Sequence, residues 1–304
     1  MRFAIEAWAT EYGTPYEPDQ LTPLDGKVEL TCEKQVAEWA PLDPPPSSGH
    51  ERVLFTDGVR RVDARVWIET PDGTSRPGVC ATYAAGAICC DGRAEVVEHR
   101  VERGVFSAFN EAAPIHTRHV RYEVRRAEGD APEQLWTAIQ QRMSELEATI
   151  ASTREVDLVV VDGPLRSPNA PTNAIGYVKT HHVTYLPDEV AHVVPALKPG
   201  QRTPLFLSLG RFARFSWYVK LPGANGHAWA GVVRCEASAD TPVGDAISMA
   251  NRVTSVLPRF ASTPHKDPRA PQNLYPIAGL ERELRRRLGD PLLLYRDLKV
   301  AAAS

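Results

Sequence analysis

The stretch Val156-Asp-Leu-Val-Val-Val-Asp162-Gly-Pro-Leu165 decides how the rest of the sequence is interpreted. A short run of apolar and β-branched residues that ends in an acid and Gly-Pro predicts a buried strand closed by a turn. In an open α/β sheet, chemistry usually takes place where strands leave the sheet. Asp162 is therefore a candidate functional residue.

A second stretch, Arg52-Val-Leu-Phe-Thr-Asp57-Gly58, has the same form. It predicts a strand over Val53–Asp57 that also ends in Asp-Gly. Asp-Gly after a strand is a common turn, so each aspartate alone has a purely structural interpretation. If the two strands are neighbours, however, they bring two carboxylates together, and this is the arrangement we expect.

The segments between these two strands predict hairpins followed by one helix. Alternating or β-branched runs predict strands over residues 62–69, 79–90, 94–106 and 119–126. The clearest helix covers residues 131–152, with Pro132 and Glu133 in its first turn. Apolar residues recur on one face of it: Leu135, Trp136, Ile139, Met143, Leu146 and Ile150. The resulting β-β-β-α-β order is the opening of a mixed sheet.

This helix offers a third acid, and two of its residues are available. Glu147 follows Met143 by four residues and precedes Ile150 by three, so it borders the apolar stripe. Glu145 points well away from that stripe. An acid that faces the edge of the sheet must border the packed face, so we favour Glu147; a solvated surface glutamate is its structural alternative.

Carboxylates gathered without His or Cys favour hard cations such as Mg²⁺ or Mn²⁺. Two such ions can clamp the attacking and leaving oxygens of a phosphodiester. Because like charges at short distance repel, the trio of Asp57, Glu147 and Asp162 is expected to need cations for stability.

Beyond Asp162 the sequence predicts a polar loop, a strand from Ile175 that ends in a basic cluster, a helix over 187–197, three strands within 204–236, and helices over 243–257 and 277–288. Lys179 beside acids can neutralise charge that develops on phosphorus. His181 or His182 is a candidate phosphate contact, and at most one of them faces the site, since neighbouring strand residues alternate. The basic loop carries His265, Lys266 and Arg269, which are candidate contacts to a nucleic-acid backbone.

The N-terminal residues differ in composition from the rest. Residues 1–50 are rich in Pro and acidic residues, and the run from Pro41 to Gly49 predicts a linker. We expect residues 1–50 to form an arm that packs on the core or on a second subunit, and residues 51–304 to form the main domain.

Composition limits the class of protein. The 304 residues are 43% hydrophobic and 24% charged, as in globular proteins, and contain no apolar run long enough for a membrane span. An early acidic residue argues against a signal peptide, and five cysteines without zinc spacing favour reduced thiols, so a cytoplasmic protein is expected. The net charge of −3 requires any polyanion to be held by a local basic patch.

Taken in order along the chain, these motifs resemble the NurA family of nucleases. The resemblance spans about residues 50 to 290 and is carried by Phe55-Thr-Asp57-Gly58, a helical Glu, Val161-Asp162-Gly163-Pro-Leu165, Gly176-Tyr-Val-Lys179 and Tyr275-Pro276. It implies an RNase H-like mixed sheet flanked by helices, here with an additional β region and the N-terminal arm. It also implies an Mn²⁺- or Mg²⁺-dependent homodimer that acts on DNA ends and single strands, as a 5'-3' exonuclease, an endonuclease or both.

The resemblance further implies roles for single residues. Asp57, Glu147 and Asp162 would be the metal-binding acids, and Lys179 and Tyr275 would complete the catalytic set. The family often has a His eight residues beyond the Tyr, whereas this sequence has Glu283. His265 is a nearby candidate to replace it.

The resemblance also implies a partner, the HerA-type hexameric ATPase, with a role in DNA end resection, repair or phage defence. The leading hypothesis is a metal-dependent DNA nuclease. The alternative is a non-catalytic DNA-end adaptor that docks on the motor, suggested by Glu283, and a third hypothesis is a phosphatase for small substrates. We expect the homodimer interface to include Met1–Leu42 or the strands within residues 200–236.

Overall fold

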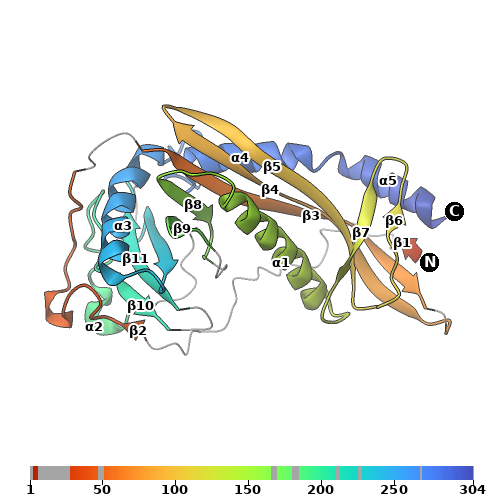
Figure 1. Ribbon diagram of the computed structural model, residues 1–304, viewed down its shortest axis with the longest axis horizontal. Helices are drawn as coiled ribbons and strands as arrows, with labels where there is room; N and C mark the ends of the chain where they lie inside the picture. The colour runs from red at the N-terminus through yellow and green to blue at the C-terminus, as the bar shows by residue number, and fades with distance from the viewer. Residues whose placement is uncertain are drawn as a thin grey trace.

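A computed structural model describes residues 3–5, 28–46, 51–70, 72–165, 170–179, 185–209, 213–224, 228–267 and 269–303. Its centre is an antiparallel set of three long strands: β3 (Val53–Glu69), β4 (Ser75–Asp91) and β5 (Arg93–Ser107) (Figure 1). The two connections are tight turns with Gly73 at φ 81° and Gly92 at φ 73°. Glycine is favoured at both because other side chains rarely adopt positive φ.

Helix α1 (Pro132–Ala151) crosses the sheet and leads into β8 (Leu158–Asp162), which pairs in parallel with β3. Strand β9 (Ala174–Val178) pairs in parallel with β8. The strand order is therefore β5-β4-β3-β8-β9, with three antiparallel strands, a helix and then two parallel strands. The predicted mixed sheet flanked by helices, with its β-β-β-α-β order, is confirmed.

The helices cover both faces of this sheet (Figure 1). On one face, Leu135, Ile139 and Ile150 of α1 pack against Leu54 and its neighbours on β3 and β4. The other face is covered by α3 (Val243–Val256), the 3-10 turn η2 (Leu257–Phe260) and α4 (Tyr275–Arg287). Truncating a buried residue such as Ile139 to Ala is expected to cost about 2–5 kcal/mol, so the position of α1 is strongly fixed.

The predicted additional β region extends the sheet beyond β9. Its strands are β12 (Val232–Ser238), β11 (Arg214–Lys220), β10 (Phe206–Ser208) and the short β2 (Val28–Glu29), and all these pairings are antiparallel. The 3-10 turn η1 (Val36–Glu38) and the short helix α2 (Asp188–Ala191) cover it.

Part of the predicted N-terminal arm belongs to this region. Residues 28–46 pack on it through Leu30 and Trp39, which are buried. The guanidinium of Arg202, 1% exposed, donates to both carboxylate oxygens of Glu33 at 2.7 and 2.8 Å. These residues therefore pack on the core, whereas residues 1–2, 6–27 and 47–50 of the arm lie outside the described residues.

At the far end of the long strands lie β1 (Phe3–Ile5), β6 (Ile115–His116), β7 (Arg121–Arg126) and a last helix, α5 (Pro291–Ala302). Helix α5 was not predicted, although Asp290 caps it by accepting from the backbone N–H of Leu292 and Leu293. Among the described residues, no helix is long and apolar enough to cross a membrane.

Two sequence predictions were wrong in their boundaries. The pair Asp57-Gly58 was expected to end a strand, but β3 continues without interruption to Glu69. Only the parallel pairing with β8 ends there, because its last paired residues are Thr56 and Val161. The helix expected over residues 187–197 is confined to the four residues of α2 and is followed by turns.

Candidate active site

Two aspartates meet because neighbouring strands are in register. Thr56 pairs with Val161, so Asp57 and Asp162 occupy equivalent positions one residue further along the parallel strands β3 and β8. Asp57 is 7% exposed and accepts a hydrogen bond from the backbone N–H of Gly58 at 2.7 Å. The convergence expected from the two strands is therefore present, at the carboxyl end of the parallel pairing.

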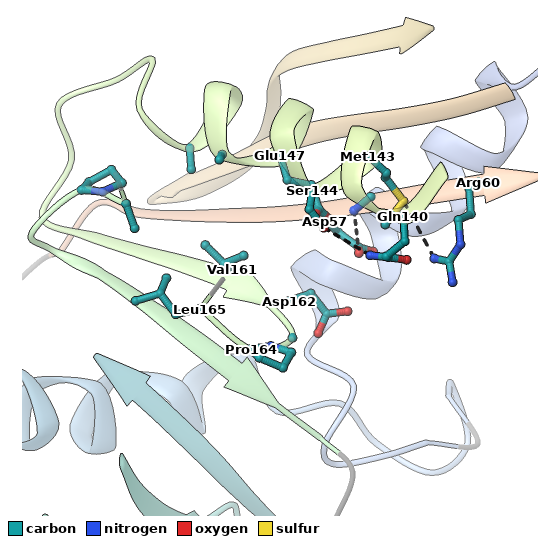
Figure 2. Close-up of a pocket in the computed structure, with 16 residues that line it drawn as sticks. Asp57, Arg60, Gln140, Met143, Ser144, Glu147, Val161, Asp162, Pro164 and Leu165 are labelled. Atoms are coloured by element: carbon teal, nitrogen blue, oxygen red, sulfur yellow. Dashed lines mark hydrogen bonds between the residues drawn. The ribbon is translucent and has the colours of Figure 1, made fainter. Parts of the chain in front are cut away.

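The third acid is Glu147, which α1 places beside Asp57. Glu147 is 8% exposed and lines the same cleft as both aspartates (Figure 2). A Cβ added to Gly58 would lie 2.5 Å from Oε1 of Glu147, so only glycine leaves room for this carboxylate next to Asp57. Glu145, the alternative, has a side chain that is 63% exposed and pairs with Arg142 outside the cleft.

The cleft has two adjoining lobes that share Asp57, Gly58, Arg60 and Asp162. One lobe, of about 220 Å³, lies between α1 and the residues that follow β8. The other, of about 320 Å³, extends toward α4. The acids thus stand between two open spaces, which suits a substrate that passes across them.

The electrostatics of the site disfavour the ionised acids. Burial, followed by the charges of Asp162 and Glu147, raises the pKa of Asp57 well above its usual range, while Lys179 opposes the shift. Burial also raises the pKa of Asp162, although Lys179 lowers it in part. The positive charge near these carboxylates is therefore too small to offset their burial and mutual repulsion.

Lys179 is held in place by a chain of polar contacts. Its ammonium donates to Asp162 at 2.7 Å and to the side-chain oxygen of Asn273 at 3.1 Å. The amide of Asn273, fully buried, donates to Asp267 at 2.6 Å. Sequence reasoning missed Asn273, and no pattern around it marks it. Because both its donor and its acceptor are used, this residue fixes the ammonium beside the acids.

A fourth acid, Glu281 on α4, lines the second lobe and was also missed. Its carboxylate is bound by Arg269 at 2.8 Å and by Arg285 at 3.0 Å. Glu281 follows buried Ile277 by four residues and precedes buried Leu284 by three. The argument from helical spacing that selected Glu147 also applies here, so the sequence did contain a signal for Glu281.

The other residues that the sequence predicted for the site do not all line the cleft. Arg269 lines the cleft, but His265 and Lys266 are exposed on the loop before α4 and do not line either lobe. His181 lies outside the described residues. The hydroxyl of Tyr275 hydrogen-bonds to Thr263 at 2.7 Å, and Tyr275 is likewise not among the cleft residues. The roles predicted for these residues stay predictions.

Glu283, at the position where the resemblance leads one to expect a His, is not among the residues that line the cleft. It pairs with Arg286 at 2.8 Å and with Arg287 at 2.7 Å. This position therefore contributes no side chain to the lobes that the described residues enclose.

The three carboxylates are ligands of the kind that a hard divalent cation prefers, although their side chains are not arranged around one point as in a metal-bound site. No group of three His, Cys, Asp or Glu side chains in the described part of the chain stands ready to hold a metal ion. The chemistry nevertheless agrees: the acids are carboxylates without thiols or imidazoles. Moreover, Oδ1 of Asp162 is buried and has no hydrogen-bond partner, as expected of an atom that binds an ion.

Fold and site together define a class: a mixed α/β protein with an acidic cleft at the carboxyl end of two parallel strands. The family model for the NurA domain matches residues 52–286. This chain belongs to the NurA family.

The crystal structure of the NurA nuclease from Sulfolobus solfataricus is similar, with a TM-score of 0.46 and 11% sequence identity. The match covers 83% of this chain and 86% of that chain. No curated protein matches the sequence.

Proposed function

We propose that this protein is a divalent-metal-dependent DNA nuclease that hydrolyses phosphodiesters at DNA ends or in single strands. The observation that carries this proposal is the register of β3 and β8, which sets Asp57 beside Asp162 with Glu147 and Lys179 around them. Membership of the NurA family and the name of its Sulfolobus member as a nuclease support it.

Asp57, Glu147 and Asp162 would hold Mn²⁺ or Mg²⁺. Such an ion supplies Lewis-acid stabilisation of the phosphoryl oxygens and lowers the pKa of bound water. Lys179, oriented by Asn273, is placed to neutralise negative charge that develops on the phosphate. Arg269, which lines the lobe toward α4, would bind the DNA backbone.

The direct test is cleavage of a fluorescent single-stranded oligonucleotide with Mn²⁺ or with EDTA. We expect cutting by the wild type with Mn²⁺, none with EDTA, and none by Asp162→Ala under either condition. Equal cutting by Asp162→Ala would place the activity outside this cleft. Turnover of a generic phosphoester without cutting of DNA would indicate a phosphatase, and DNA binding without cutting would indicate an adaptor.

We further propose a homodimer that works with a HerA-type hexameric translocase. A ring that delivers emerging strands supplies a high effective concentration of DNA, which suits a chain with a net charge of −3. The isolated protein is expected to cut weakly and with strong salt dependence, and to cut much faster when the ATPase and ATP are added. The dependence of the cleavage rate on salt, measured with and without the ATPase, tests the coupling, and full activity of the isolated protein at physiological salt would contradict it.

Light scattering tests the homodimer, and a monomer at micromolar concentration would contradict it.

A further inference from the structure

Arg269 and Arg285 reach the second lobe of the cleft from the loop before α4 and from α4 itself. Their side chains are 55% and 62% exposed, so both guanidinium groups are accessible to solvent. Between them lies the carboxylate of Glu281, whose side chain is only 18% exposed. The positive groups are thus open, and the negative group beneath them is covered.

The contacts divide the carboxylate between the two arginines. Arg269 donates to Oε2 at 2.8 Å, whereas Arg285 donates to Oε1 from both Nη2 and Nε, at 3.0 and 3.2 Å. Each oxygen of one anion is therefore held by its own guanidinium. The two non-bridging oxygens of a phosphodiester can be held in the same way, one by each guanidinium, and arginine is a preferred binder of phosphate oxygens.

The two arginines and Glu281 lie directly beside the aspartates of the candidate active site. Glu281, Asp57 and Asp162 line the same lobe. The negative charge of Glu281 contributes to the raised pKa values of both aspartates. The arginines lower the pKa of Glu281 itself against the effect of burial, so Glu281 is an anion that occupies the guanidinium groups at neutral pH.

We propose that Arg269 and Arg285 form a phosphate subsite for the DNA strand and that Glu281 occupies this subsite until a backbone phosphate displaces it. The inference rests on the proposed function for the identity of the strand. It adds Arg285 and Glu281 to the DNA-binding residues and assigns Glu281 the role of a competing internal anion. Ion pairs between partly exposed side chains are weak, so a phosphate can displace this carboxylate.

If Glu281 occupies the subsite, removing its charge must strengthen DNA binding more than removing the charge of a glutamate elsewhere on α4. The test uses fluorescence anisotropy of a fluorescein-labelled oligothymidylate with the full chain in EDTA, so that no cleavage is involved. Glu281→Gln is expected to bind about fivefold more tightly than the wild type, the factor that a unit charge at about 4 Å produces in water. Glu281→Ala must change affinity in the same direction.

The matched control is Glu283→Gln. It changes the same residue type on the same helix, also paired with two arginines, but outside the cleft. It is expected to leave affinity within about twofold, since a surface charge away from the binding site is largely screened. Arg269→Ala with Arg285→Ala is expected to bind more weakly than the wild type and to lose the gain from Glu281→Gln when combined with it.

Equal affinities of Glu281→Gln and Glu283→Gln would overturn the inference, as would a gain that persists without the two arginines. Absence of DNA binding by every variant would overturn it as well. Failure of the nuclease assay leaves this test intact, since binding is measured without metal. Conversely, a metal-dependent nuclease whose affinity is indifferent to Glu281 would retain the proposed function and lose the subsite.

Discussion

Replacing Glu147 with Gln is expected to slow cleavage of single-stranded DNA by about a hundredfold or more, the effect of losing one electrostatic contact at a reaction centre. Glu147 contributes a buried carboxylate to the cleft, packed against Gly58 beside Asp57. The amide keeps the volume of the side chain but removes the charge that a divalent cation requires. Single-turnover cleavage rates at saturating Mn²⁺ give the comparison.

Glu145→Gln supplies the control, because it removes the same charge two residues away on α1. Its side chain is 63% exposed and pairs with Arg142, so its rate should match the wild type. Equal activity or equal impairment of the two variants would show that Glu147 has no special role in cleavage. Melting temperatures of both variants separate a loss of fold from a loss of chemistry.

Asp57→Asn is expected to abolish cleavage while it stabilises the metal-free protein. Burial and two neighbouring carboxylates raise the folded-state pKa of Asp57 above its ordinary value of 3.8. The folded state therefore binds this proton more tightly than the unfolded state does. The stabilisation is complete at low pH and is lost as pH rises from about 4 through the raised pKa, so at higher pH Asp57 opposes folding.

The melting temperature of Asp57→Asn without metal should accordingly exceed that of the wild type at pH 7, by about 2–4 °C if the charge costs ~1 kcal/mol. Near pH 4 the difference should vanish, because Asp57 is then neutral in the folded protein. Mn²⁺ should raise the melting temperature of the wild type but not that of the variant. A variant less stable than the wild type at pH 7 in EDTA would contradict the proposed repulsion.

The central part of the fold could be predicted from the sequence because each of its elements carries a local signal. Helix α1 has an apolar stripe and a Pro at its start, and the strand that ends at Asp162 is a buried apolar run closed by Gly163. The continuation of β3 past Gly58 could not be predicted, since Asp-Gly reads locally as a turn. Only the pairing with β4, opposite Gly86 and Ala85, keeps this segment extended.

The residues of the candidate site also differ in whether the sequence alone could reveal them. Asp57, Asp162 and Glu147 are recognisable from strand ends and helical spacing, because those patterns report which face a side chain occupies. Asn273 orients Lys179 across 94 positions of sequence, a contact that only tertiary packing creates. Glu281 is different, because its spacing between buried Ile277 and Leu284 on α4 does mark it as bordering the packed face.

If Asp57, Glu147 and Asp162 together bind a divalent cation, the protein must take up Mn²⁺ in the absence of DNA. Electron paramagnetic resonance reports free Mn²⁺, so a titration measures uptake without DNA and without activity. We expect saturable uptake by the wild type and by Glu145→Gln, and loss of this uptake in a variant with Asp57→Asn and Asp162→Asn combined. Undiminished uptake by the doubly substituted protein, folded as judged by its melting curve, would show that these acids do not form the cation site.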